Sequence, residues 1–161
     1  MKGLRCGHSG SDIDKGLGNA NKILNRFLYS IMRKKYDMVL SEIGGGNLHN
    51  AIAREAYAVV GVKDKYKEDM RVKLNVFLAN VQNEYKKTDP NLDIQLESVQ
   101  MPSKIIKKGV AEKLIHSLYA CPHGVIGMSF DIDGLVETST NLASVKMLEN
   151  YTIEVGTSQR S

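Results

Sequence analysis

This chain of 161 residues has no tryptophan, three prolines and two cysteines, Cys6 and Cys121. Two cysteines are too few for the disulfide framework of a secreted domain and favour a reducing compartment. No run of about 18 apolar residues is present, as a membrane span would need, and no signal-peptide core follows Met1. We therefore expect a cytoplasmic protein of one domain with no membrane partner.

Metal-ligand spacing is also missing. A metal site needs imidazoles, thiolates or carboxylates that converge on one ion. The histidines stand in no such spacing with one another or with cysteine; they are His8, His49, His116 and His123. We expect no metal to be bound by this chain itself.

The chain carries a formal charge of +4 and has a pI of about 9.0. Nucleic-acid binding would need the basic residues to cluster or to alternate with aromatic residues that stack on bases. Here they are dispersed along the chain, and several stand beside acidic residues. We therefore expect no nucleic-acid partner.

Periodicity predicts helices and strands in alternation. Apolar residues recur at three- and four-residue steps in three segments, which predicts helices over 15–33, 65–87 and 103–119. Alternating or β-branched stretches predict strands over 36–43, 51–62, 92–96, 135–147 and 151–158, with a short opening strand at 3–6.

The predicted order places the chain in the α+β class. Residues 1–101 follow β-α-β-β-α-β, the ferredoxin-like two-layer sandwich, and residues 102–161 follow α-β-β as an incomplete second copy. We expect one antiparallel sheet with helices on one face.

Two glycine motifs interrupt these elements. Glycine on both sides of His8 and Ser9, in Gly7-His8-Ser9-Gly10, allows a tight turn that exposes the imidazole. The run Gly44-Gly45-Gly46 lies between two predicted strands and lacks the Lys-Ser/Thr pair and the following helix of a phosphate loop. The sequence contains no Gly-x-Ser-x-Gly nucleophile elbow. It also contains no Cys–His pair that would indicate covalent catalysis.

Together with Asn50-Ala51-Ile52-Ala53-Arg54-Glu55, these motifs resemble the lid, or dimerisation, domain of aminoacyl-histidine dipeptidases, which are carnosinase-like zinc metallopeptidases. The resemblance covers residues 2–161. The family commonly has glycine where Cys6 stands and proline where Ala53 stands, which makes the preferred dipeptide less secure.

The resemblance implies a parent hydrolase that cleaves Xaa-His dipeptides with two zinc ions. Those ions would be held in a catalytic domain absent from this chain, because neither the family's His-x-Asp pair nor its Glu-Glu doublet occurs here. A metal-bound hydroxide would attack the peptide carbonyl. The chain would contact that catalytic domain and the dipeptide, form a homodimer through the lid, and be inactive alone.

Site residues follow from the same resemblance. It implies that His8 stabilises the oxyanion, in its own or a partner subunit, and that Asn141 and Arg160 grip the substrate carboxylate. The alternative for the latter pair is a polar strand residue and a frayed end. Structural roles in the two loops are expected for Gly7, Gly10, Gly44, Gly45, Asn50 and Arg54. The competing function is a stand-alone ferredoxin-like module for small-ligand binding or regulatory dimerisation.

Overall fold

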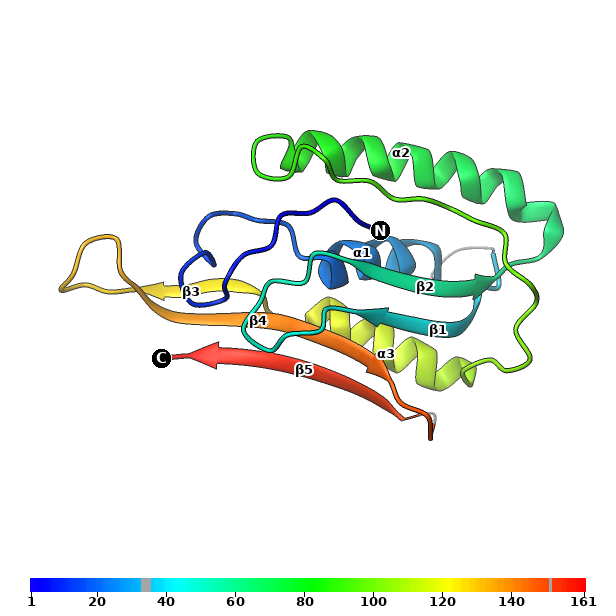
Figure 1. The fold of residues 1–161 in the computed structure, drawn as a ribbon. Coiled ribbons are helices and arrows are strands. Elements are labelled where there is room, and N and C mark those ends of the chain that lie inside the picture. The colour runs from blue at the N-terminus through cyan, green and yellow to red at the C-terminus, as the bar shows by residue number, and fades with distance from the viewer. Residues whose placement is uncertain (33–35, 151) are drawn as a thin grey trace.

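The structure is a computed structural model that describes residues 1–32, 36–150 and 152–161. Three helices and five strands follow in the order α1 (Ala20–Met32), β1 (Val39–Gly45), β2 (Ala56–Gly61), α2 (Lys67–Tyr85), α3 (Lys108–Ala120), β3 (Gly124–Met128), β4 (Val136–Met147) and β5 (Ile153–Arg160). A short 3-10 turn, Asp64–Tyr66, precedes α2. Every strand pair is antiparallel, which confirms the predicted α+β class (Figure 1).

Strand β4 is the centre of the sheet. Strand β5 pairs with residues 139–147 along one edge of β4. The other edge is shared, because β3 pairs with residues 136–140 and β1 meets β4 where Gly45 faces Val145. Strand β2 pairs with the free side of β1. Residues 139–145 are all buried, so β4 is covered on both of its faces.

Helices α1 and α3 lie side by side against one face of this sheet (Figure 1). The apolar stripe of α1 supplies much of the core, including Ile23, Leu28 and Ile31, each at most 2% exposed. Helix α2 packs on α1, where the rings of Phe27 and Phe77 lie 5.2 Å apart. The stripe that predicted α1 is therefore the surface that joins it to its neighbours.

The prediction of strands at residues 3–6 and 92–96 is wrong, because neither segment forms a strand. Only a single antiparallel bridge, between Lys2 and Asp93, joins these segments. Gly3 has a φ of +83°, outside the β region, and the amide of Arg5 donates to the buried carboxylate of Asp89 at 2.7 Å instead of to a strand. The first half is therefore α1-β1-β2-α2 and lacks the two outer strands.

Strand β3 was not predicted. Its five residues include Gly124 and Gly127, and they do not alternate regularly between buried and exposed. Pairing with β4, and not the pattern of β3 itself, makes this segment a strand. The second half is therefore α-β-β-β where α-β-β was expected. The division of the chain at residue 101 stays a prediction.

Several element boundaries also differ from the prediction, and α3 begins at Lys108 and not at residue 103. Helix α1 begins at Ala20 and not at residue 15, because Gly16 takes a φ of +67° and Asn19 caps the first turn. Strand β2 begins at Ala56, since residues 51–55 pair with the N-terminal segment only through a bridge at Ala51. Among the described helices, none has the length and apolarity to cross a membrane.

Candidate functional site

The motif at residues 7–10 forms a tight turn that exposes the side chain of His8. The backbone N–H of His8 donates to Asp12 Oδ2 at 2.7 Å, and the N–H of Asp12 donates back to the carbonyl oxygen of His8 at 2.9 Å. The N–H of Gly10 donates to His8 Nδ1 at 3.0 Å. Because Nδ1 accepts, the proton of the neutral ring is on Nε2, which is left as a hydrogen-bond donor.

Both glycines of the turn have close neighbours. A Cβ at Gly7 would lie 2.5 Å from Leu17 Cδ1 and 3.1 Å from Asp12 Cβ. A Cβ at Gly10 would lie 3.2 Å from the ring of His8. A side chain at Gly7 would therefore force Leu17 to move, and one at Gly10 would press on the imidazole of His8.

A short antiparallel contact fixes the turn to residues 50–52. His8 and Ala51 form a bridge; the N–H of Ser9 donates to the carbonyl of Asn50, and the N–H of Ile52 to the carbonyl of Gly7, both at 2.8 Å. Only the backbone of Asn50 takes part. Its side chain is exposed and has no hydrogen bond within the part of the chain that the structure describes.

The glycine run lies where β1, β2 and β4 converge. A Cβ at Gly44 would lie 2.8 Å from the ring of Tyr57, and one at Gly45 would collide with the amide oxygen of Asn21. Gly46 has a φ of +67°, and a Cβ there would collide with the carbonyl oxygen of Ala143. The run therefore lets three strands approach closely.

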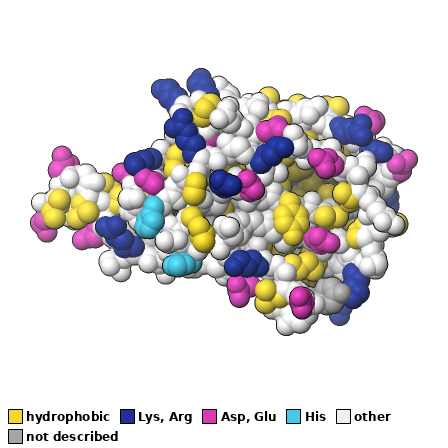
Figure 2. Space-filling model, in the orientation of Figure 1, with side chains coloured by type: hydrophobic (Ala, Val, Ile, Leu, Met, Phe, Trp, Pro, Cys, Tyr) yellow, Lys and Arg dark blue, Asp and Glu magenta, His cyan; other side chains and the backbone are white. Residues whose placement is uncertain are grey.

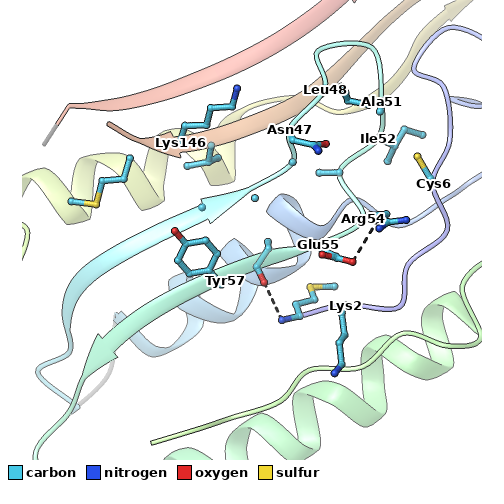
Figure 3. A pocket seen from close by; sticks show the side chains of 18 of the residues that line it. Lys2, Cys6, Asn47, Leu48, Ala51, Ile52, Arg54, Glu55, Tyr57 and Lys146 are labelled. Atoms are coloured by element: carbon cyan, nitrogen blue, oxygen red, sulfur yellow. Dashed lines mark hydrogen bonds and ion pairs between the residues drawn. The ribbon is translucent and has the colours of Figure 1, made fainter. Parts of the chain in front are cut away.

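An open groove of about 850 Å³ lies over this run, between the start of β2 and the end of β4 (Figure 3). Lys2, Arg54, Glu55 and Lys146 give it a mixed charge, and Arg54 Nε lies 3.6 Å from Glu55 Oε1. His8 does not line it. The groove thus reaches the neighbours of the His8 turn, Cys6 and Ala51, but not His8 itself, and Arg54 lies in the groove.

Arg160, at the end of β5, lies beside the His8 turn. Its Nη1 donates to the carbonyl oxygen of Gly10 at 3.2 Å, and its Nη2 donates to that of Val136 at 3.0 Å. Histidine and basic side chains are exposed near the base of the projecting β3–β4 hairpin (Figure 2). The structure thus brings together two of the predicted site residues, His8 and Arg160, from opposite ends of the chain.

Asn141 is buried and does not reach the surface that His8 and Arg160 share. Its side chain is buried, and Nδ2 donates to the carbonyl oxygen of Ala51 at 2.9 Å. Its partner on the other side is Asn19, whose Nδ2 lies 3.5 Å from Asn141 Oδ1. Sequence reasoning missed Asn19, for which the one available signal was a capping residue type directly before a helix.

The half-buried His123 lies beside the two buried asparagines. Its Nδ1 lies 3.4 Å from Asn19 Nδ2. Burial, together with the nearby charge of Lys22, lowers the pKa of His123 to about 4. The ring is therefore neutral at physiological pH, and its Nδ1 can accept a hydrogen bond from Asn19. Within residues 1–32, 36–150 and 152–161, no three His, Cys, Asp or Glu side chains converge on a point that could hold a metal ion.

Comparison with known proteins agrees with the resemblance found in the sequence. The chain is 38% identical over 150 residues to the cytosol non-specific dipeptidase of Escherichia coli (strain K12), covering 93% of this chain and 31% of that protein. The crystal structure of the aminoacylhistidine dipeptidase from Vibrio alginolyticus superposes with a TM-score of 0.95 at 34% identity, over 99% of this chain and 32% of that one.

The chain therefore spans about a third of the length of these relatives. Residues 1–89 match the sequence model of the M20 peptidase dimerisation domain, which is more than half of the 161 residues. The expected kinship with a dipeptidase dimerisation domain is confirmed. The chain belongs to the M20 peptidase dimerisation domain family.

Proposed function

We propose that this chain is the lid and dimerisation domain of a cytoplasmic, zinc-dependent dipeptidase that hydrolyses Xaa-His dipeptides. The names of both relatives support a dipeptidase, and one of them supports a histidine-containing substrate. The observation that carries the proposal is the hydrogen bond from Gly10 to His8 Nδ1, in a turn that Arg160 also binds.

The described residues do not fit a zinc site, so the two zinc ions belong to a catalytic domain outside this chain. The contribution of the chain is to bind and orient the substrate. The lid joins two subunits, and His8 serves the active site of its own subunit or of the partner subunit.

His8 acts on the oxygen of the scissile carbonyl. When a nucleophile adds to the carbonyl carbon, negative charge develops on that oxygen. The Nε2–H of His8 donates a hydrogen bond to it, in an orientation that the Gly10 amide has already set. A donor aimed at the transition state in this way contributes about 3 kcal/mol.

Arg160 binds the substrate carboxylate. Arginine has five N–H donors. Two of them bind the carbonyls of Gly10 and Val136, so three remain for a carboxylate. The exposed amide of Asn50 lies next to the His8 turn and supplies a further polar contact. Asn141 would reach substrate only if its bond to Ala51 opened, so we assign it to support that segment from below.

The test is hydrolysis of Xaa-His dipeptides by the full-length enzyme. We expect activity that a chelator abolishes and zinc restores, and no activity from the 161-residue chain alone. Cleavage by the isolated chain would contradict the proposal, because the chain would then hold a catalytic site of its own. A full-length protein that cleaves no dipeptide would also contradict it and would favour a ligand-binding module.

A further inference from the structure

We infer that Asn19 is a positioning residue for His8, acting through Asn141 and the carbonyl group of Ala51. The inference rests on the proposed role of His8 and adds a residue that lies outside the His8 turn. Asn19 lies 11 positions beyond His8, directly before α1, and no hydrogen bond joins the two side chains in the described part of the chain.

Asn19 joins α1 to β4. Its Oδ1 accepts the N–H of Lys22 at 3.2 Å and so caps the helix. Its Nδ2 donates to the carbonyl oxygen of Leu142 at 2.9 Å and lies 3.5 Å from Asn141 Oδ1. The side chain is 2% exposed. One amide therefore sets the distance between the first turn of α1 and the central strand.

Asn141 connects Asn19 to the segment that pairs with the His8 turn. Its side chain is 1% exposed, and its Nδ2 holds the carbonyl of Ala51 at 2.9 Å. Ala51 is in turn the bridge partner of His8. The path from α1 to His8 therefore runs through two buried amides and one backbone bridge.

His123 limits the orientation of Asn19 from the other side. Its Nδ1 lies 3.4 Å from Asn19 Nδ2, which can only donate, so a hydrogen bond between them uses the neutral tautomer that carries its proton on Nε2. Asn19 Nδ2 then faces three acceptors, on His123, Asn141 and Leu142. Buried amides are stable only when paired, so this arrangement favours one orientation over others.

Such precision matters for a group that acts on a transition state. A displacement of about 1 Å at a reacting group can lower the rate about 100-fold. An apolar side chain at position 19 would fill space, but it would neither bind Leu142 nor orient the amide of Asn141. We therefore expect Asn19 to affect the catalytic rate more than the affinity for substrate.

The test uses the full-length enzyme with Asn19→Ser and Asn19→Asp. Serine keeps the helix cap but is too short to reach β4. Aspartate keeps the length and the cap but removes the amide donor. For both, we expect kcat to fall about 10- to 100-fold while KM changes less than about threefold. In a His8→Ala background, neither change should lower kcat further, because coupled residues are not additive.

Asn25→Ser is the matched control. Asn25 is also a buried asparagine of α1, and its Nδ2 donates to the carbonyl oxygen of Ile115 at 3.0 Å, away from the His8 turn. We expect its kcat to stay within about twofold of the wild type.

The outcomes separate the two claims. If His8→Ala leaves kcat unchanged, the proposed function fails. If His8→Ala lowers kcat but the Asn19 variants do not, or lower it equally in both backgrounds, the inference is overturned. It is also overturned if Asn25→Ser reproduces the loss, because the effect would then be one of stability alone.

Discussion

Arg160 Nη1 donates a hydrogen bond to the carbonyl oxygen of Gly10 at 3.2 Å, across 150 positions of the chain. Its other terminal nitrogen binds Val136, so one guanidinium group ties the His8 turn to β5 and to the base of the β3–β4 hairpin. The imidazole and the guanidinium group, the two strongest candidate substrate contacts, therefore keep a defined relative position.

Replacement of His8 by alanine in the full-length enzyme should lower kcat about 100- to 1000-fold and change KM only a few-fold. The reason is that the Nε2–H donor acts on charge that exists only in the transition state. Steady-state kinetics on a Xaa-His dipeptide measures both constants. His116→Ala, an exposed histidine of α3, is the control and should behave as wild type. A kcat within about threefold of wild type for His8→Ala would rule out the oxyanion role.

Arg160→Lys should weaken recognition of the substrate carboxylate. Lysine keeps the charge but loses the planar fork, and a charge-assisted pair of bonds contributes about 1.5–3 kcal/mol. We expect kcat/KM for a dipeptide to fall about 10- to 100-fold. We also expect the preference for the dipeptide over its C-terminal amide to shrink. Arg71→Lys, on the exposed face of α2, is the control. An unchanged preference would place the carboxylate elsewhere.

The helices could be predicted because their own periodicity encodes them. The stripe that includes Ile23, Phe27 and Ile31 faces the core along its whole length. Strand β3 and the false strands at residues 3–6 and 92–96 could not be read in this way. Strand β3 depends on its pairing with β4, and residues 3–6 depend on the carboxylate of Asp89, which accepts the N–H of Arg5 across 84 positions. Residues 92–96 form only the single bridge between Lys2 and Asp93.

In the candidate site too, some features are encoded locally in the sequence and others depend on contacts with distant segments. Glycines around His8 predict a turn from local geometry alone. The approach of Arg160 to that turn depends on the register of β5 against β4, where Ser139 faces Arg160. Asn19 reads as an ordinary helix cap, because its contacts with Asn141 and Leu142 come from more than 100 positions away.

Gly46→Ala should destabilise the chain by more than about 2 kcal/mol. A non-glycine residue at a φ of +67° is strained, and the added methyl group would collide with the carbonyl of Ala143. Gly109→Ala is the opposite control: it lies in the first turn of α3 with nothing within 4 Å of the added carbon, so it should stabilise by about 0.5 kcal/mol. Urea unfolding followed by circular dichroism measures both. Equal effects of the two changes would contradict the packing described at Gly46.

The free energy of unfolding should fall as the pH is lowered from about 6.5 to about 4. The pKa of His123 is lowered from 6.5 to about 4 in the folded chain, mainly by burial and then by the charge of Lys22. Above pH 6.5 both states carry a neutral ring, and His123 gives no pH dependence. Between the two values only the unfolded state binds the proton, so unfolding becomes easier. Below about pH 4 both states are protonated, and the loss levels off at up to about 3 kcal/mol.

His123→Gln should remove this part of the pH dependence, since glutamine does not titrate and can still present an oxygen to Asn19. Between pH 7 and pH 4 the wild type should lose up to about 3 kcal/mol of stability relative to the variant, when the free energies of unfolding are measured in urea at intervals of pH. His49→Gln, in the exposed loop after the glycine run, should keep the wild-type profile. Parallel profiles for wild type and His123→Gln would mean that His123 takes up its proton equally well in the folded and unfolded chains. In that case burial would not keep the ring neutral, and the acceptor for Asn19 at Nδ1 would be lost in mild acid.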